Sequence, residues 1–391
     1  MAIIGKFFLV LYITKKLTLE DLGIYNLLSV TVAVFLFIVG FEFHSYTGRQ
    51  YKDRANKNFL LINQFVAHFI FYLIAIPLSY FLFFKHMVDS EYLLLIYLII
   101  IFDHISQEIS RVFVYVGKSV IYNFLFFLKN GAWVFPLMLI SFSFETEIDI
   151  TEILQYWFYG TIVAFLTGFI FLFKYRFIRP SVIDFKWILK GYKVAFPFFL
   201  MAISLRIIEF SDRYLIENFL NLKQLGIYSF YFGIAGIATT LITSSIGVQY
   251  IPLFLAAENN LTKLKQHVKS YLYKILSIYS IIIIGILVLL PYLISYMEKD
   301  ELFSYYNIIW LMIANSILIS LTIIPQNILY ALKKDSVLMY SSIIGALVNI
   351  FINIVFLEKI GLYAAVFSTT ITYILIILIR ILFLKNKCQW I

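Results

Sequence analysis

The sequence predicts an all-α, polytopic membrane protein with about twelve transmembrane helices in two six-helix bundles. The 391-residue chain is 62% hydrophobic and 14% charged, with a mean hydropathy of +0.92, whereas soluble domains carry about 25% charge. The charges form short clusters between apolar runs of roughly 20 residues, the length that crosses a bilayer. The tetrapeptide Leu22-Gly23-Ile24-Tyr25 recurs 203 residues later as Leu225-Gly226-Ile227-Tyr228, which indicates a duplicated half.

Twelve apolar segments are predicted to be helices, at residues 1–14, 23–43, 59–84, 92–116, 119–144, 152–173, 194–217, 225–249, 271–294, 305–332, 337–357 and 360–384. The first is short, because fourteen helical residues reach only about 21 Å against about 30 Å of hydrocarbon. We expect either residues upstream that complete this span or a half-helix that enters from one side. No small-residue cleavage site follows it, so a cleaved signal peptide is not expected.

The longest basic loop divides the segments into two sets of six. The predicted domains are therefore residues 1–173, a cytoplasmic linker at 174–193, and residues 194–391. An even number of helices returns the chain to the same side, so the halves share one orientation and a pseudo-two-fold axis along the membrane normal. Two such bundles enclose a central cleft, and rocking of the bundles would give alternating access.

The net charge of +9 follows membrane topology and does not indicate nucleic-acid binding. Nineteen loop lysines and arginines fall on one side of the predicted membrane and six on the other, which places both termini in the cytoplasm. The single cysteine, Cys388, excludes an internal disulfide and a cysteine metal cluster. No nucleotide-binding or hydrolase motif is present. We predict no catalytic residue, no metal site and no cofactor.

The fourth predicted helix contains a polar stripe. Its members are spaced 0, 3, 4 and 7, so they share one helix face: His104, Gln107, Glu108 and Arg111. A charge at mid-bilayer costs at least about 2.5 kcal/mol, so the stripe is expected to line the central cavity. The alternative is structural, with Glu108 and Arg111 neutralising each other.

The seventh predicted helix repeats this arrangement with Arg206, Glu209 and Arg213, spaced 0, 3 and 7, and with Asp212 beside them. Glu209 can pair with either arginine, which leaves one spare positive charge unless Asp212 takes it. As the first helix of the second half, this helix is expected to line the cleft. Alternatively, Arg213 lies near the outer interface and extends toward water.

Lys129 lies near the middle of the fifth predicted helix, where an unpaired lysine is costly. A cavity or an anionic partner is therefore expected rather than lipid. His68 in the third helix is expected to be a hydrogen-bonded core histidine rather than a ligand. Together with the arginines, Lys129 suggests an anionic substrate, and the planar guanidinium suits bidentate contacts with pyrophosphate.

Several stretches carry a family resemblance. They are residues 17–49, residues 104–111 running on to 129–133, Asp212-Arg213-Tyr214 ahead of residues 225–228, and Asn349, Asn353 and residues 361–365. Together they resemble Wzx-type flippases of O-antigen and capsule repeat units, in the multidrug/oligosaccharidyl-lipid/polysaccharide superfamily. The short first helix departs from that family, in which the first helix lines the cleft.

The resemblance implies export of an undecaprenyl-pyrophosphate-linked oligosaccharide across the bacterial inner membrane, as in lipopolysaccharide or capsule synthesis. A proton or sodium ion is the expected coupling ion, and other polysaccharide assembly proteins are expected partners. The family's cationic cavity matches the charged residues above. We therefore predict seven substrate-binding residues: Arg206, Lys129, Arg111, Arg213, His104, Glu108 and Glu209.

Two other function classes compete with the flippase. A multidrug-and-toxin exporter would favour unpaired carboxylates in the cavity, whereas here the arginines and the lysine at least balance them. A membrane glycosyltransferase or polymerase would need a sizeable outer loop for its active site. The longest predicted outer loop, at residues 295–304, has about ten residues, which argues against an enzyme.

Overall fold

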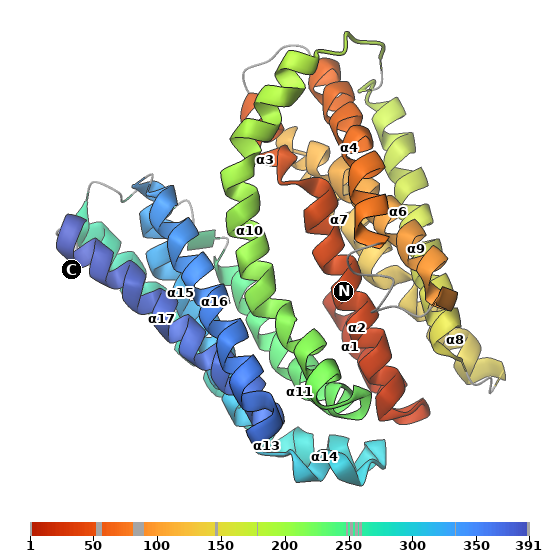
Figure 1. Ribbon diagram of the computed structural model, residues 1–391, viewed down its shortest axis with the longest axis vertical. Helices are drawn as coiled ribbons and strands as arrows, with labels where there is room; N and C mark the ends of the chain where they lie inside the picture. Colours follow the sequence, from red (N-terminus) through yellow and green to blue (C-terminus); the bar gives the residue numbers. More distant parts are fainter. Residues whose placement is uncertain are drawn as a thin grey trace. The chain divides into compact units, whose positions relative to one another are not determined.

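The structure is a computed structural model that describes residues 2–51, 57–80, 90–144, 148–177, 179–247, 249–250, 253–254, 257, 260–332 and 334–388. Within these ranges the chain is helical and contains no strand (Figure 1). The helices are α1 (Ala2–Lys16), α2 (Leu19–Gly40), α3 (Phe43–Gln50), α4 (Lys57–Ser79), α6 (Ser90–Tyr115), α7 (Ser119–Phe127), the π-helical turn η2 (Leu128–Ala132), α8 (Val134–Phe144), α9 (Ile150–Lys174), α10 (Phe185–Phe219), α11 (Leu222–Leu241), the π-helical turn η3 (Ile242–Gly247), α13 (Leu261–Met297), α14 (Asp300–Ser304), α15 (Ile308–Ala331), α16 (Asp335–Ile360) and α17 (Leu362–Cys388).

The predicted fold class is confirmed. Ten helices of the described ranges are long and apolar enough to cross a membrane. The remaining two predicted segments correspond to α1, with 15 residues, and α11, with 20 residues. The predicted segment 119–144 is one helical run, in which η2 interrupts α7 and α8. Residues 81–84 of the predicted third segment lie outside the described residues.

Two helices begin well before their predicted starts. α10 begins at Phe185 and α13 at Leu261, about ten residues ahead of the apolar runs. Leucine, lysine and glutamine are good helix formers, and the Asn260 side chain accepts a hydrogen bond from the Lys263 backbone N–H at 3.0 Å, which caps α13. Hydropathy located the membrane-spanning part of each helix and not its polar extension.

The chain packs as two compact units. Unit 1 comprises Met1–Tyr12 and Leu27–Ile203, and unit 2 comprises Ile13–Asn26 and Ser204–Ile391. α10 continues from one unit into the other, and its first nine residues occupy the second half of the predicted linker. The predicted division into residues 1–173 and 194–391 stays a prediction.

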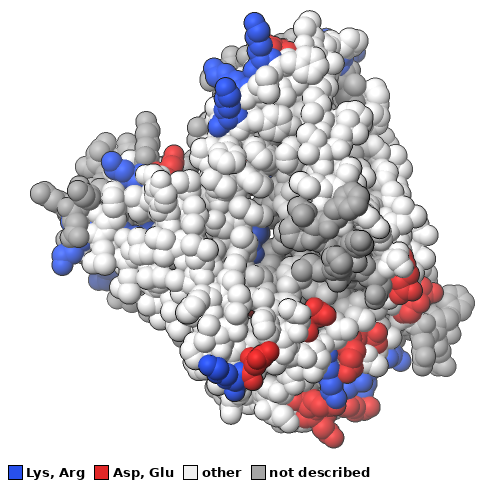
Figure 2. Space-filling view, in the orientation of Figure 1, with Lys and Arg blue, Asp and Glu red and all other residues white. Residues whose placement is uncertain are grey.

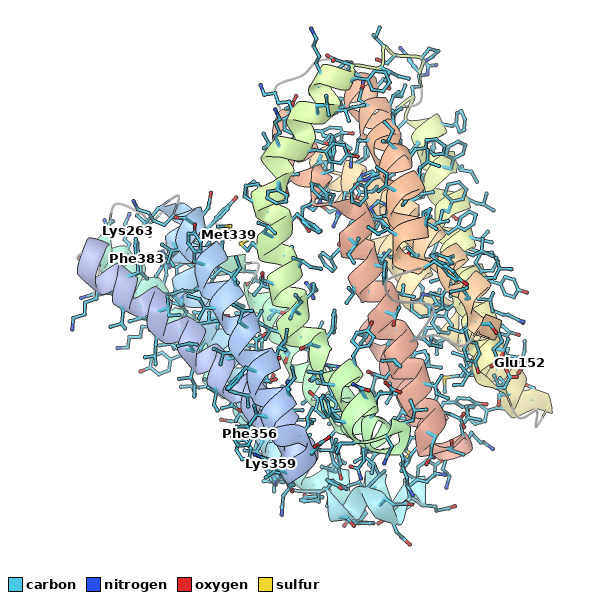
Figure 3. The ribbon with its side chains drawn as sticks, viewed as in Figure 1. Glu152, Lys263, Met339, Phe356, Lys359 and Phe383 are labelled. Carbon is cyan, nitrogen blue, oxygen red and sulfur yellow. The ribbon has the colours of Figure 1, made fainter. Side chains whose placement is uncertain are left out.

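On the face of unit 1 that Figure 2 shows, most surface charges lie near the ends of the helices. In this view Lys and Arg lie at the end where α10 begins and acidic side chains lie near the opposite end, while the visible long sides of the helices are almost uncharged. In unit 2, Lys263 and Lys359 lie at opposite ends (Figure 3). Lys263 lies between the eighth and ninth predicted segments and Lys359 between the eleventh and twelfth, so the predicted topology places them on opposite sides of the membrane. Which side is cytoplasmic stays a prediction from the positive-inside rule.

The two copies of the repeated tetrapeptide meet inside unit 2, near the starts of α2 and α11. A Cβ built on Gly226 would stand 1.8 Å from the backbone oxygen of Leu19, and one on Gly23 would stand 2.3 Å from that of Leu222. Leu19 and Leu222 are themselves equivalent positions of the repeat, so the contact is reciprocal. Backbones approach this closely only where a residue has no side chain.

Loops that the sequence places on the outer side also meet in unit 2. Lys15 Nζ lies 2.7 Å from Glu298 Oε1, and Lys223 Nζ lies 2.7 Å from Glu301 Oε1. The hydrogen bond from Lys223 lowers the pKa of Glu301. Both pairs are at least partly exposed to solvent, so they add little stability, but they place three predicted outer segments at the same end of the unit.

Candidate functional site

Glu108 on α6 is the centre of a buried polar cluster in unit 1. Its carboxylate accepts hydrogen bonds from Gln64 Nε2 on α4 and from the Arg111 guanidinium one turn along α6. His68 Nε2 and His104 Nε2 each lie 3.6 Å from a Glu108 oxygen. The predicted polar stripe is therefore packed against α4, with Glu108 and Arg111 paired as in the structural alternative.

Lys129 has an anionic partner within the protein. Its Nζ lies 2.6 Å from Asp103 Oδ1 on α6, and both side chains are buried. Lys129 belongs to the π-helical turn η2, a local geometry that frequently marks functional sites. The same turn allows α1 to approach, since a Cβ on Gly5 would stand 3.0 Å from the Gly131 oxygen.

Arg206 and Glu209 of α10 form an ion pair in the wall of a cavity of about 440 Å³ in unit 2. Their side chains are 32% and 33% exposed. The wall also contains the carboxylate of Asp212, together with hydroxyl groups, an amide group and aromatic rings: Tyr228, Phe232, Thr239, Thr240, Thr243, Asn315, Ser316, Thr369 and Tyr373. This volume is within the range of small-molecule pockets, so the cavity can hold a polar group the size of a phosphate or one sugar.

Arg213 is buried behind that wall. Its guanidinium pairs with Asp212, which also accepts a hydrogen bond from Tyr228, and its Cζ lies 3.9 Å from the centre of the Phe232 ring. Arg213 is 1% exposed, so it does not extend to an outer interface. Arg206 therefore pairs with Glu209 and Arg213 pairs with Asp212. The unpaired positive charge that the sequence left open on this helix is absent.

The structure reveals two cations that the sequence analysis missed. Lys6 on α1 has an exposed side chain within electrostatic range of Asp103 and Lys129. Arg380 on α17 is 2% exposed and donates hydrogen bonds to Ser341, Ser342 and Gln326. Among the described residues, neither cation forms an ion pair with a carboxylate.

The signal for both cations was present in the sequence. Each is an isolated charge inside an apolar run, as Lys129 is, and not a member of a cluster of charges at helical spacing. Lys6 also changes the charge balance of its surroundings. Lys6 is in electrostatic range of the ion pair between Lys129 and Asp103, so in its protonated form it adds a positive charge that this neutral pair does not offset.

The seven predicted site residues form two groups. His104, Glu108, Arg111 and Lys129 lie in unit 1, and Arg206, Glu209 and Arg213 lie in unit 2. Each of the four predicted cations among them pairs with a carboxylate. Their role in substrate binding stays a prediction.

Comparison with known proteins identifies the fold. No protein-family model and no curated protein matches the sequence. Among solved structures, the chain is similar to an inward-facing multidrug resistance MATE family transporter of the MOP superfamily, with 13% identity and a TM-score of 0.75 over 100% of this chain and 96% of that one. It is also similar to the lipid II flippase MurJ in an inward closed conformation, with 16% identity and a TM-score of 0.73 over 98% and 86% of the chains. An outward-facing MATE transporter matches with 14% identity and a TM-score of 0.68, covering 100% of this chain and 93% of that one.

Proposed function

We propose that this protein is a flippase that moves an undecaprenyl-pyrophosphate-linked oligosaccharide, an O-antigen or capsule repeat unit, across the bacterial inner membrane by alternating access. It is a transporter and not an enzyme in this proposal. The observation that carries it is Lys6, whose exposed side chain is in electrostatic range of the buried ion pair between Lys129 and Asp103. An exposed ammonium on an apolar helix is costly unless it faces water or an anion.

Three further features support a lipid-linked anion as the substrate. Arg206 is one-third exposed in the wall of the unit 2 cavity, and the planar guanidinium group suits bidentate contacts with phosphate oxygens. The hydroxyl and amide groups of that wall suit a sugar. One of the similar structures is a flippase for lipid II. We propose a proton or a sodium ion for coupling and other polysaccharide assembly proteins as partners.

A multidrug exporter is the second candidate. The unit 2 cavity contains Glu209 and Asp212, and carboxylates suit a cationic drug. Two of the similar structures are multidrug resistance transporters. The two candidates differ in the sign of the substrate charge, which makes them separable by experiment.

Replacing Lys6 with alanine is expected to slow flipping by about tenfold or more, since a charge-assisted contact contributes about 1.5–3 kcal/mol. The measurement uses vesicles containing the purified protein and a fluorescent polyprenyl-pyrophosphate-linked sugar, with an impermeant quencher to report the outer leaflet. Lys6→Glu should be slower still. Lys16→Ala, at the exposed end of the same helix, is the control and should transport normally. Dye efflux without lipid flipping would instead support the multidrug exporter.

Replacing Arg206 with alanine is expected to abolish surface polysaccharide in a bacterium that lacks its own flippase and is rescued by this chain. The change also leaves Glu209 without its ion-pair partner, so Arg206→Ala/Glu209→Gln is the matched variant. If Arg206 contacts the substrate, both variants fail while membrane levels stay normal. Recovery of surface polysaccharide in the double variant would show that the single change acted only through the stranded carboxylate.

A further inference from the structure

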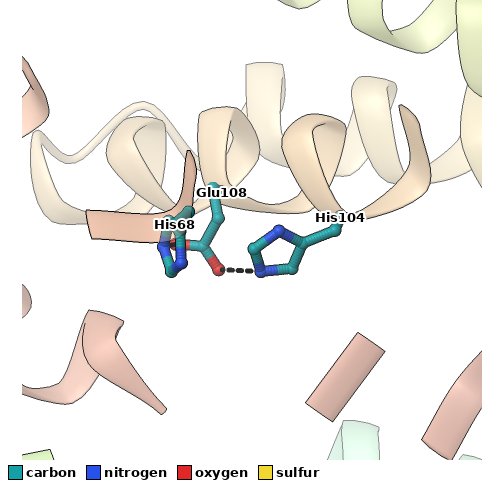
Figure 4. Close-up of side chains that lie close together, drawn as sticks. All are labelled: His68, His104 and Glu108. Carbon is teal, nitrogen blue, oxygen red and sulfur yellow. Dashed lines mark ion pairs between the residues drawn. The ribbon is translucent and has the colours of Figure 1, made fainter. Parts of the chain in front are cut away.

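Three side chains with metal-binding chemistry converge in the interior of unit 1. His68 comes from α4, and His104 and Glu108 come from adjacent turns of α6. They are 3%, 1% and 2% exposed, and one ligand atom of each lies within 4.8 Å of those of the other two. Figure 4 shows the two rings directed at the same carboxylate. The sequence analysis had predicted no metal here and had assigned His68 to the core.

The spacing of these atoms suits a bound ion better than hydrogen bonds. Each histidine Nε2 lies 3.6 Å from a Glu108 oxygen, which is too far for a hydrogen bond. Two ligands about 2.0–2.2 Å from one tetrahedral zinc ion stand roughly 3.3 Å apart. Both Nε2 atoms are buried and have no hydrogen-bond partner, an arrangement that normally costs about 1–3 kcal/mol. An ion between them would satisfy both.

The neighbours of the three residues resemble a second coordination shell. The Tyr72 hydroxyl lies 2.5 Å from His104 Nδ1. When Nδ1 carries the proton and donates it to that oxygen, Nε2 keeps its lone pair for a metal. Gln64 holds Glu108 through its Nε2. The buried Oε1 of Gln64 has no hydrogen-bond partner, so it is available as a fourth ligand.

Arg111 is the main argument against a cation at this site, because its guanidinium contacts Glu108. Two observations reduce that objection. A carboxylate offers about four lone-pair positions, so Glu108 can hold both a guanidinium and a metal. Glu42 is a second carboxylate in electrostatic range of Arg111, so two negative charges offset all but one of the three positive charges of the arginine and the divalent ion.

We propose that His68, His104 and Glu108 bind one divalent transition-metal ion of the zinc class. Two imidazoles and one carboxylate form a ligand set typical of zinc, whereas calcium and magnesium prefer oxygen ligands alone. The bound ion ties α4 to α6 within unit 1. This inference is independent of the transported substrate.

The test measures zinc binding to the purified full chain in detergent, with any affinity tag removed, in competition with a chromophoric chelator. We expect one tightly bound Zn²⁺ per chain. His68→Gln and His104→Gln should each weaken binding more than hundredfold, and Tyr72→Phe by about 10–100-fold, the range measured for second-shell changes. His267→Gln on α13 of unit 2 is the control and should bind as the unchanged chain does.

Two outcomes would overturn the proposal. One is zinc affinity that stays within a few-fold of the unchanged chain in His68→Gln and His104→Gln, because the ion then binds elsewhere. The other is a spectroscopic result obtained with the unchanged protein, so it does not depend on whether a variant folds. Bound Co²⁺ should show the intense visible absorption of a four-coordinate site, and X-ray absorption of the zinc form should show two imidazoles. Weak six-coordinate Co²⁺ absorption, or a zinc spectrum without imidazole, contradicts the site.

Discussion

Replacing Gly226 with alanine is expected to destabilise this protein by roughly 3 kcal/mol, the upper end of the usual cost of overpacking. The added methyl group would stand 1.8 Å from the backbone oxygen of Leu19 and 2.7 Å from its carbonyl carbon. Because backbone atoms cannot rotate away as a flexible side chain does, α2 and α11 must separate. Gly23→Ala meets the backbone oxygen of Leu222 at 2.3 Å and should have the same direction of effect.

A glycine of the same helix provides the control. A Cβ on Gly236 would have only the Phe232 ring nearby, at 4.0 Å. Gly236→Ala should therefore be neutral or stabilising by up to about 1 kcal/mol, the difference in helix propensity between the two residues. The measurement is the apparent melting temperature of the purified protein in detergent. Equal melting temperatures for Gly226→Ala and Gly236→Ala would contradict the close helix contact.

The repeat illustrates how far the sequence could be interpreted. Hydropathy located all ten helices that are long and apolar enough to cross a membrane, since the bilayer requires long apolar runs whatever the tertiary packing. The matching tetrapeptides indicated a duplication. They did not show that the two glycines meet each other's helix, because a contact between Gly226 and Leu19 depends on how distant helices pack.

The candidate sites show the same limit. Spacing along α6 correctly predicted that Glu108 and Arg111 share a face, since helical periodicity alone determines that. Gln64 and His68 join them from α4, and Asp103 pairs with Lys129 from another helix. Those partners depend on the rotation of each helix about its axis. The hydropathy pattern does not predict this rotation when a helix is apolar on all faces.

Replacing Lys129 with glutamate is expected to cause the largest loss of function and stability among the charged residues. Lys129 and Asp103 are both buried, at 2.6 Å, and removing one partner of a buried pair costs about 3–5 kcal/mol. Glutamate adds repulsion between two carboxylates to that cost. Lys129→Ala should be destabilised less, because it leaves only one unpaired carboxylate. The amount of protein in the membrane and the apparent melting temperature should both be lowest for Lys129→Glu, intermediate for Lys129→Ala and highest for the unchanged protein.

Exchanging the two charges separates a structural role of Lys129 from contact with the substrate. Asp103→Lys/Lys129→Asp restores an ion pair and keeps the net charge around Lys6 unchanged, so the melting temperature should recover most of the loss seen in Lys129→Glu. If Lys129 also contacts an anionic headgroup, the position of the positive charge matters, and flipping in vesicles should stay low in the exchanged protein. Recovery of both stability and flipping would show that Lys129 has only a structural role, in the ion pair that joins η2 to α6. Lys6 and Arg206 would then be the cations proposed to contact the substrate.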